Sequence, residues 1–439
     1  MANVRRIALR LLEGWERDET YLNLSMNSPM TRELSREEKG FLTSLLYGTV
    51  ERRITLDYLI SVAAKRSEID PTSRNILRLG FYQLFFMDKI PPFAAVSETV
   101  SLASSAGQRS FLNGVLRGAL RTFTDESGAR SLPFPPRKKN LGRHLSIAYS
   151  YPSELVRHFL ALLGEQETEQ LLDACNKTAP LTLAVNTVRI SRDELLSVLA
   201  EQGIRAEKTL RSPVGIRLFD PTPVALLPGF AEGWFYVQDE ASQLSAVILA
   251  PKRGELVIDP CACPGGKSFA AAIAMEDAGE VRACDLHESK LPLIAEGAQR
   301  LGLRSVSVAE RDATEADPAL IGRADAVLCD VPCSGLGVLA KKPDLRYRFE
   351  ERTDLPSLQA RILSQSARYV RSGGRLLYST CTLNPAENER VFEDFIKEHP
   401  DFVPCPFRVE DLDAPEGILT LYPHRHGCDG FFYALARRL

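Results

Sequence analysis

The run Leu256-Val-Ile-Asp259-Pro-Cys-Ala-Cys-Pro-Gly-Gly-Lys267 joins an apolar strand to an alanine-rich helix through two adjacent glycines. Glycine lets the backbone approach a ligand closely, and the start of the following helix offers unpaired N–H donors. Apolar strand-like runs and helical stretches then alternate along the chain. The pattern predicts a doubly wound α/β sheet whose ligands lie beyond the carboxyl ends of the strands.

The expected elements divide the chain into three parts. Within the sheet domain, strands are predicted at 256–259, 280–285, 305–309, 324–330 and 374–379, and helices near 267–276, 289–301, 354–371 and 385–398. Residues 1–125 carry helical periodicity, and the Pro-rich basic stretch 131–140 is typical of a linker. We therefore expect an all-α domain at 1–140, a small α+β module at 146–235 and the sheet domain at 236–439.

The glycine loop differs from two common nucleotide-binding patterns. A P-loop would need glycine at Cys261, and the G-x-G-x-x-G fingerprint is absent. Asp285 ends the second strand, where an acidic residue commonly binds ribose hydroxyls, and Asp312 follows the third strand. Both also suit turn residues, but together with the loop they favour S-adenosylmethionine over NAD. The cofactor-binding candidates are Cys261, Ala262, Cys263, Pro264, Gly265, Gly266, Lys267, Asp285, Asp312 and Asp330.

Two cysteines follow strand-like runs, in Asp330-Val-Pro-Cys333 and in Ser379-Thr-Cys381. Two thiols at the ends of strands, beside a cofactor loop, indicate covalent catalysis. The nine cysteines of so long a chain do not suggest a disulfide framework, so reduced thiols in the cytoplasm are expected. We predict no metal site. Five further cysteines are interpreted as buried apolar residues, namely Cys175, Cys284, Cys329, Cys405 and Cys428.

Charge is distributed unevenly along the chain. Residues 1–145 hold 22 Lys and Arg against 15 Asp and Glu, a balance of +7, and the remainder holds 32 against 42, a balance of −10. A basic amino-terminal third suits a partner that carries phosphates, although surface solvation would also explain it. The chain shows neither a secretory signal nor an apolar run of about 18–20 residues, so we expect no membrane span.

The motifs resemble those of the RsmB/NOP (Fmu/Sun) family of RNA (cytosine-C5) methyltransferases. The resemblance rests on the cofactor loop at 259–267, the Pro-Cys motif at 330–335, the Thr-Cys motif at 379–388 and the closing Asp429-Gly-Phe-Phe432. Residues 90–99 and 111–117 are similar to the NusB-type helical extension of RsmB. The resemblance covers nearly the whole chain. Val331 departs from it, because the family more often has alanine there.

The resemblance implies a Rossmann-like methyltransferase domain that uses S-adenosylmethionine, preceded by a small α+β module and an all-α NusB-like RNA-binding domain. It assigns Cys381 as the nucleophile that adds to C6 of cytosine, and it assigns Cys333 to removal of the C5 proton and product release. Asp330 would hydrogen-bond the N3 and amine edge of the base. We also expect Lys267 to interact with this acidic, thiol-bearing loop.

The implied activity is C5 methylation of a cytosine in 16S ribosomal RNA, with no membrane and no obligate protein partner. Alternatives are the same chemistry on tRNA or another RNA, and a non-catalytic NusB-like RNA-binding factor. A DNA cytosine methyltransferase is disfavoured, because that family uses its Pro-Cys thiol as the nucleophile and needs no Thr-Cys partner. The basic segment 341–348 is predicted to contact phosphates and to stack on an unpaired base.

Overall fold

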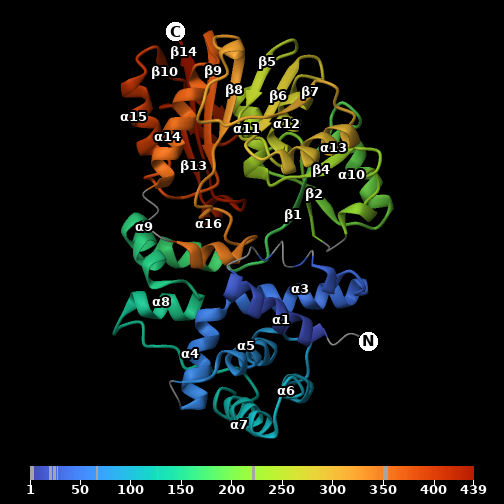
Figure 1. Ribbon diagram of the computed structural model, residues 1–439, viewed down its shortest axis with the longest axis vertical. Coiled ribbons are helices and arrows are strands. Elements are labelled where there is room, and N and C mark those ends of the chain that lie inside the picture. Colours follow the sequence, from blue (N-terminus) through green and yellow to red (C-terminus); the bar gives the residue numbers. More distant parts are fainter. Residues whose placement is uncertain are drawn as a thin grey trace. The chain divides into compact units, whose positions relative to one another are not determined.

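The computed structural model describes residues 4–18, 22, 26, 28–65, 68–125, 127–219, 223–349 and 354–439. The chain forms two compact units (Figure 1). Unit 1 comprises Met1–Asn176 and Lys341–Phe349, and unit 2 comprises Lys177–Ala340 and Glu350–Leu439. Unit 1 therefore contains a segment that comes from far along the chain.

Unit 1 is helical, as its 3.6-residue periodicity predicts. Its helices are α1 (Val4–Asp18), α3 (Arg36–Glu51), α4 (Arg53–Ala64), α5 (Pro71–Phe86), α6 (Pro92–Val100), α7 (Ala106–Thr122), α8 (Leu141–Tyr149) and α9 (Ser153–Ala174), with a 3₁₀ turn at Pro29–Thr31. Polar side chains cap several helix starts; Ser35 and Glu38 form a capping box at α3, and Asp70 accepts from Ser73 N at α5. The apolar faces of α1 to α7 pack into one core.

The 3₁₀ segment η5 (Pro343–Arg348) packs into this helical unit. Arg346 is fully buried and donates to Glu51 O at 3.1 Å, Ser150 O at 3.2 Å and Asn176 Oδ1 at 3.1 Å. Its guanidinium lies 4.1 Å from the ring centroid of Tyr151. A buried arginine needs such partners, because an unpaired buried charge is costly.

The neighbouring Tyr347 is engaged in the same way. Its hydroxyl donates to Val50 O at 2.7 Å, and its ring lies 4.2 Å from the guanidinium carbon of Arg53 and 5.9 Å from the ring of Trp15. The prediction that segment 341–348 contacts phosphates and stacks on a base is therefore wrong for Arg346 and Tyr347. Arg346 is buried and bonded through Nη1, and the hydroxyl and ring of Tyr347 contact other residues of unit 1.

Unit 2 begins with a small antiparallel sheet in the order β2-β3-β1-β4. Its elements are β1 (Leu181–Val185), α10 (Arg192–Glu201), β2 (Ala206–Lys208), β3 (Gly215–Leu218), the 3₁₀ turn Val224–Leu226 and β4 (Phe235–Val237). The apolar sides of the strands and of α10 form their own core. The small α+β module is confirmed as part of the fold, but residues 146–176 of its predicted range 146–235 belong to unit 1.

The larger sheet of unit 2 runs in the order β10-β14-β9-β8-β5-β6-β7, with β13 paired to β14. Its strands are β5 (Leu256–Asp259), β6 (Glu280–Asp285), β7 (Val306–Glu310), β8 (Ala324–Asp330), β9 (Val370–Thr380), β10 (Phe402–Pro404), β13 (Ile418–Leu421) and β14 (Phe431–Arg438). Strands β5 to β9 pair in parallel, whereas β10, β13 and β14 add antiparallel pairs at one edge. The doubly wound sheet is confirmed, and the antiparallel edge is an addition that the sequence reading missed.

Helices cover both faces of this sheet (Figure 1). They are α11 (Glu240–Leu249), α12 (Gly266–Ala274), α13 (Leu291–Leu301), α14 (Asp354–Ala367), α15 (Glu389–Glu398) and the short α16 (Pro423–His426); 3₁₀ turns lie at Glu288–Lys290 and Pro318–Leu320, and a small hairpin joins β11 (Phe407–Val409) to β12 (Leu412–Ala414). Successive residues of β8 alternate between two cores, with Leu328 on the α11–α13 side and Val327 on the α14–α15 side. Strands β6 and β7 are added on one side of β5, and β8 and β9 on the other side. The loop after β5 therefore lies at the topological switch point.

Replacing Arg346 by alanine should destabilise unit 1 by about 2–4 kcal/mol, because a fully buried side chain is removed and three buried or part-buried acceptors lose their donor. The chain has two tryptophans, and Trp15 lies in unit 1. Denaturant unfolding followed by Trp15 fluorescence, in a Trp234→Phe background, would measure the loss. Lys342→Ala, at an exposed neighbouring position, is the matched control. Equal midpoints for the two variants would contradict a structural role for Arg346.

Candidate active site

The two motif cysteines come together because β8 and β9 are neighbours. The strands pair in parallel with Asp330 opposite Ser379, so the loops that follow them leave the same edge of the sheet side by side. The sulfur atoms of Cys333 and Cys381 lie 3.3 Å apart. Gly337 N also donates to Cys381 O at 2.9 Å, which joins the two loops through the main chain. Sequence predicts thiols at strand ends, and the structure adds their direct contact.

The Cys333 thiol has a raised pKa. Its hydrogen bond with Cys381 raises the pKa of the Cys333 thiol well above its usual value, and burial, the charge of Cys381 and the nearby carboxylates of Glu387 and Asp330 act in the same direction. Cys333 therefore remains a thiol at neutral pH. Its S–H group can donate to the sulfur of Cys381.

Asp330 and Lys267 form an ion pair beside the thiols. Asp330 Oδ2 accepts from Lys267 Nζ at 2.7 Å, and Asp330 Oδ1 accepts from Ser379 Oγ at 2.8 Å. Burial alone would lower the pKa of Lys267, but the Asp330 carboxylate outweighs burial, and Cys381 adds to the effect, so the pKa of Lys267 is raised. The expectation that Lys267 interacts with the acidic, thiol-bearing loop is confirmed, and its ammonium group stays charged.

The glycine loop turns sharply into α12. Gly265 has φ of 105°, and a Cβ there would lie 2.5 Å from Cζ of Phe269. A Cβ on Gly266 would approach Gln238 Nε2 to 3.2 Å. The conformation at Gly265 and the close packing at both positions explain the two glycines, and no side chain caps the first turn of α12 at the switch point.

Asp285 and Asp312 occupy different surroundings. Asp285 ends β6, and its carboxylate accepts from Cys263 N at 3.3 Å and from His287 N at 3.1 Å. Asp285 is therefore tied to the glycine loop. Asp312 is exposed, and it accepts from both the backbone and the hydroxyl of Thr314. The contacts of Asp312 are those of a turn residue, which was one of its two interpretations.

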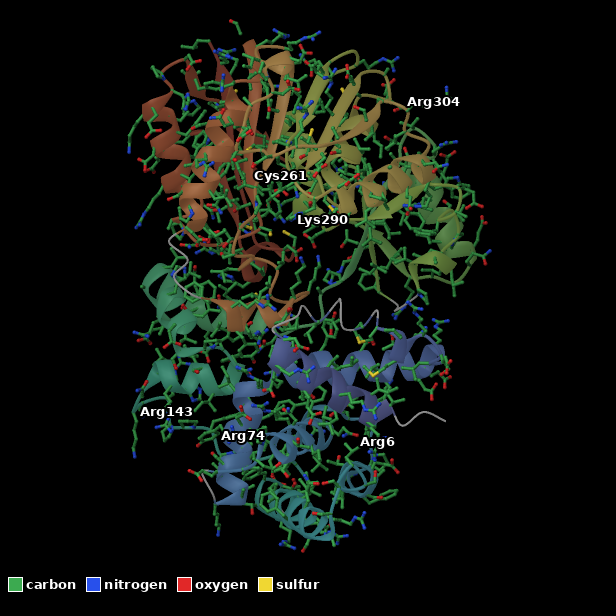
Figure 2. All side chains as sticks on the ribbon, viewed as in Figure 1. Arg6, Arg74, Arg143, Cys261, Lys290 and Arg304 are labelled. Carbon is green, nitrogen blue, oxygen red and sulfur yellow. The ribbon has the colours of Figure 1, made fainter. Side chains whose placement is uncertain are left out.

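Figure 2 shows how the side chains are distributed around the sheet. Cys261, from the glycine loop, and Lys290, from the segment after β6, lie at the same end of the sheet, whereas Arg304, just before β7, lies at the opposite end. Lys290 Nζ lies 3.8 Å from Asp285 Oδ1. The loops at the carboxyl ends of β5 and β6 thus gather charged side chains around the expected cofactor position.

Asp259 lies beneath the glycine loop at the end of β5. It is 1% exposed, and its Oδ2 accepts from Ser268 Oγ at 2.6 Å. Burial raises the pKa of Asp259 to about 7, with a further contribution from the charge of Asp330, while the Ser268 hydrogen bond and Lys267 oppose the shift. Asp259 belongs to the cofactor-loop motif at 259–267, but the sequence predicted no role for its carboxyl group.

Within the described residues, the remaining cysteines form no disulfide. Cys175, Cys284, Cys329 and Cys428 are buried, as expected, and Cys405 is half-buried. Within the described ranges, no three His, Cys, Asp or Glu side chains gather in a way that could hold a metal ion. In the same part of the chain, no helix has the length and apolar character needed to cross a bilayer.

One group of buried polar residues was missed by sequence reasoning. Glu387 is 1% exposed and lies in the Thr-Cys motif, where it binds Ser334 of the Pro-Cys loop. Gln359 of α14 contacts the same carboxylate. The sequence does show an acidic residue six positions after Cys381. It does not show that Glu387 binds Ser334 and Gln359, because these residues are distant in sequence.

Comparison with known proteins gives three family-model matches and full-length relatives. The models are "16S rRNA methyltransferase RsmB/F" at residues 246–437, "NusB family" at 2–121 and "Methyltr_RsmF/B-like, ferredoxin-like domain" at 151–225. The chain is 38% identical to "Probable ribosomal RNA small subunit methyltransferase B" of Synechocystis and 37% identical to the protein of that name in Bacillus subtilis, in each case over 99% of both chains. The crystal structure of a methyltransferase homologue from Pyrococcus horikoshii matches 67% of this chain and 98% of its own, with a TM-score of 0.60 and 27% identity.

Replacing Asp259 by asparagine should change the pH dependence of stability. The folded chain holds a proton on Asp259 that the unfolded chain releases above the ordinary aspartate pKa of 3.8. The free energy of unfolding of the unmodified protein should therefore fall, relative to Asp259→Asn, as pH rises from about 4 to about 7, by about 1.4 kcal/mol for each unit of pKa shift.

Denaturant unfolding followed by Trp234 fluorescence, in a Trp15→Phe background, would measure this difference at pH 4.5, 6 and 8. Asparagine can still accept from Ser268, so the comparison isolates the charge. A difference between the two proteins that stays constant across this range would contradict the raised pKa of Asp259.

Proposed function

The chain belongs to the ribosomal RNA small subunit methyltransferase B family, and on this basis we propose that it transfers a methyl group from S-adenosylmethionine to C5 of a cytosine in 16S ribosomal RNA. Methylation of ribosomal RNA follows from the family. The target atom and the covalent route are proposed from the site. The observation that carries them is the 3.3 Å contact between the sulfurs of Cys333 and Cys381.

Cytosine C5 is a poor nucleophile, and a thiolate can activate it. In the proposed reaction Cys381 Sγ forms a bond to C6, which makes C5 enamine-like and able to take an electrophilic methyl group. S-adenosylmethionine, when bound, would supply that methyl group from its sulfonium sulfur, with cleavage of the methyl–sulfur bond leaving a neutral thioether. A base then removes the C5 proton, the electron pair re-forms the C5–C6 double bond, and the bond between C6 and Cys381 Sγ breaks. Cys381 leaves as a thiolate, ready for another cycle.

Cys333 suits the role of the base that acts late. Before addition, the hydrogen bond to Cys381 and the charge of that residue keep Cys333 protonated. Once the Cys381 sulfur is bonded to carbon, both of those influences on Cys333 are weakened. The pKa of Cys333 should then fall, so that its thiol can release its proton to water and the resulting thiolate can accept the proton from C5.

Asp330 and Lys267 provide the charges around the target cytosine. We assign Asp330 to the N3 and amine edge of cytosine, where it stabilises charge as the adduct forms. Lys267 holds the Asp330 carboxylate at 2.7 Å and interacts electrostatically with Cys381, which favours the thiolate. The pair would therefore contact the cytosine through Asp330 and stabilise the nucleophile Cys381 through Lys267.

The residues at the switch point fit S-adenosylmethionine. The N-terminus of α12 has no side-chain cap at Gly265, and Asp285 ends the adjacent strand in contact with the loop. We assign cofactor binding to the loop 261–267 with Asp285, and we keep Asp312 and Asp330 as further contacts. The uncapped start of α12 and the strand-end carboxylate are the observations that support this assignment.

The RNA substrate is supported by the NusB-family match and by the basic balance of residues 1–145. Ribosomal RNA as substrate would place the reaction in the cytoplasm. A cytosine inside a helix must leave its stack to reach the thiols, so we expect an unpaired target. The same chemistry on another RNA remains the second candidate. A non-catalytic role is disfavoured, because Cys333, Cys381 and Asp330 are all present and Cys333 and Cys381 are in contact.

Substituting each cysteine in turn should separate the two proposed roles. Cys381→Ala should abolish methylation while retaining cofactor binding, because the thiol activates the base and does not hold the cofactor. Cys333→Ala should still add to the RNA but release it slowly, so a covalent protein–RNA band should persist on a denaturing gel.

The readout for methylation is bisulfite sequencing of 16S ribosomal RNA from cells that lack the protein and are complemented with each variant. Cys405→Ala is the matched control, since that thiol is half-buried and free. Full methylation by Cys381→Ala would refute the proposal. The proposal would also fail if cells that lack the protein kept the same cytosine methylation in 16S ribosomal RNA.

A further inference from the structure

The carboxylate of Glu387 joins the two loops that carry the thiols. Its Oε1 accepts from Ser334 Oγ at 2.6 Å and from Asn384 Nδ2 at 2.9 Å. Its Oε2 accepts from Ser334 N at 2.9 Å and from Gln359 Nε2 at 3.0 Å. Ser334 directly follows Cys333, and Asn384 lies three residues after Cys381. One buried side chain thus bridges both loops and helix α14.

Gln359 reaches the other side of Cys333. Its Nε2 donates to Pro332 O at 2.9 Å as well as to Glu387. The residues immediately before and after Cys333 are therefore both held by the group that centres on Glu387. The position of the Cys333 sulfur follows from these two fixed neighbours.

The Cys381 loop is fixed by the same group. Ser334 Oγ lies 2.7 Å from Thr382 Oγ1, and Thr382 directly follows Cys381. The main chain at Glu387 is anchored by Tyr378, whose hydroxyl donates to Glu387 O at 2.5 Å. Each cysteine is thus directly adjacent in sequence to a residue that belongs to this hydrogen-bonded group.

We propose that Glu387 is a positioning residue that holds the sulfurs of Cys333 and Cys381 in contact, acting through Ser334, Gln359 and Asn384. What the contact accomplishes rests on the proposed function, but the positioning role itself does not. A carboxylate suits the place because it only accepts hydrogen bonds, and four donors converge on its two oxygens. Glutamine has the same shape but would turn an NH₂ group toward two of those donors.

The first measurement reports the distance between the sulfurs without any RNA. An azodicarboxamide oxidant takes two electrons and two protons from a pair of neighbouring thiols, which become a disulfide. In the full-length protein, the Cys333–Cys381 disulfide should form several-fold more slowly in Glu387→Gln than in the unmodified protein. Peptide mapping by mass spectrometry identifies the bond among the nine cysteines.

Glu389→Gln is the matched control, because Glu389 lies two residues away and accepts from Thr420 instead. This variant should form the disulfide at the rate of the unmodified protein. Gln359→Leu, which removes the tie to Pro332 O, should slow disulfide formation in the same direction as Glu387→Gln. It also tests the proposal if Glu387→Gln fails to fold, as judged by its melting transition.

The second measurement uses the reaction. Glu387→Gln should lower kcat by about tenfold or more, because small displacements of reacting groups are costly, while the KM for S-adenosylmethionine stays nearly unchanged. The covalent protein–RNA adduct should accumulate, since a misplaced Cys333 delays release more than addition. A merely structural defect would lower addition and release together and leave no adduct.

The two measurements separate the two claims. If the unmodified protein forms no adduct and methylates no cytosine, the proposed function fails while the disulfide rates still decide the role of Glu387. If a folded Glu387→Gln variant forms the disulfide at the unmodified rate, the positioning role is overturned. If Glu387→Gln is unfolded, an unmodified rate in Gln359→Leu overturns it equally.

Discussion

Parallel pairing of β8 with β9, with Asp330 opposite Ser379, is the constraint on which the rest of the site depends. Because the register is fixed by the burial of both faces of the sheet, it also fixes where each following loop begins. The two loops start side by side, and the sulfurs of Cys333 and Cys381 meet at 3.3 Å. A slip of one residue would turn every side chain of the strand to the other face and separate the thiols.

Burial, charges and hydrogen bonds together set the protonation of the groups at this edge. Desolvation raises the pKa of Asp259 to about 7. The carboxylate of Asp330 keeps Lys267 charged, and the hydrogen bond to Cys381 helps Cys333 to keep its proton. Three groups of ordinary acidity thus acquire distinct states within one small region. That arrangement offers a thiol, a nearby sulfur able to ionise and an ammonium group, which together suit addition to a pyrimidine ring.

Much of this was predictable, because strands buried on both faces leave a strong apolar signal. Strand β8 has the expected bounds, 324–330, and the thiol positions follow from it. Three features were not predictable. The antiparallel strand β14 was seen only as part of a motif, since a short apolar run does not reveal its pairing partner. Arg346 carries a charge, which usually means exposure, yet it is fully buried. Glu387 acquires its role only from Ser334 and Gln359, which are distant in sequence.

The central claim, that Cys381 is the residue that bonds to the base, can be tested by trapping the adduct. A 16S ribosomal RNA fragment containing 5-fluorocytidine would be incubated with the full-length protein and S-adenosylmethionine, because fluorine at C5 cannot be removed as a proton is. After nuclease and protease digestion, mass spectrometry locates the nucleotide-linked cysteine. The account predicts a link to Cys381. A link to Cys333, or no covalent adduct in a preparation that methylates unmodified 16S RNA, would contradict it.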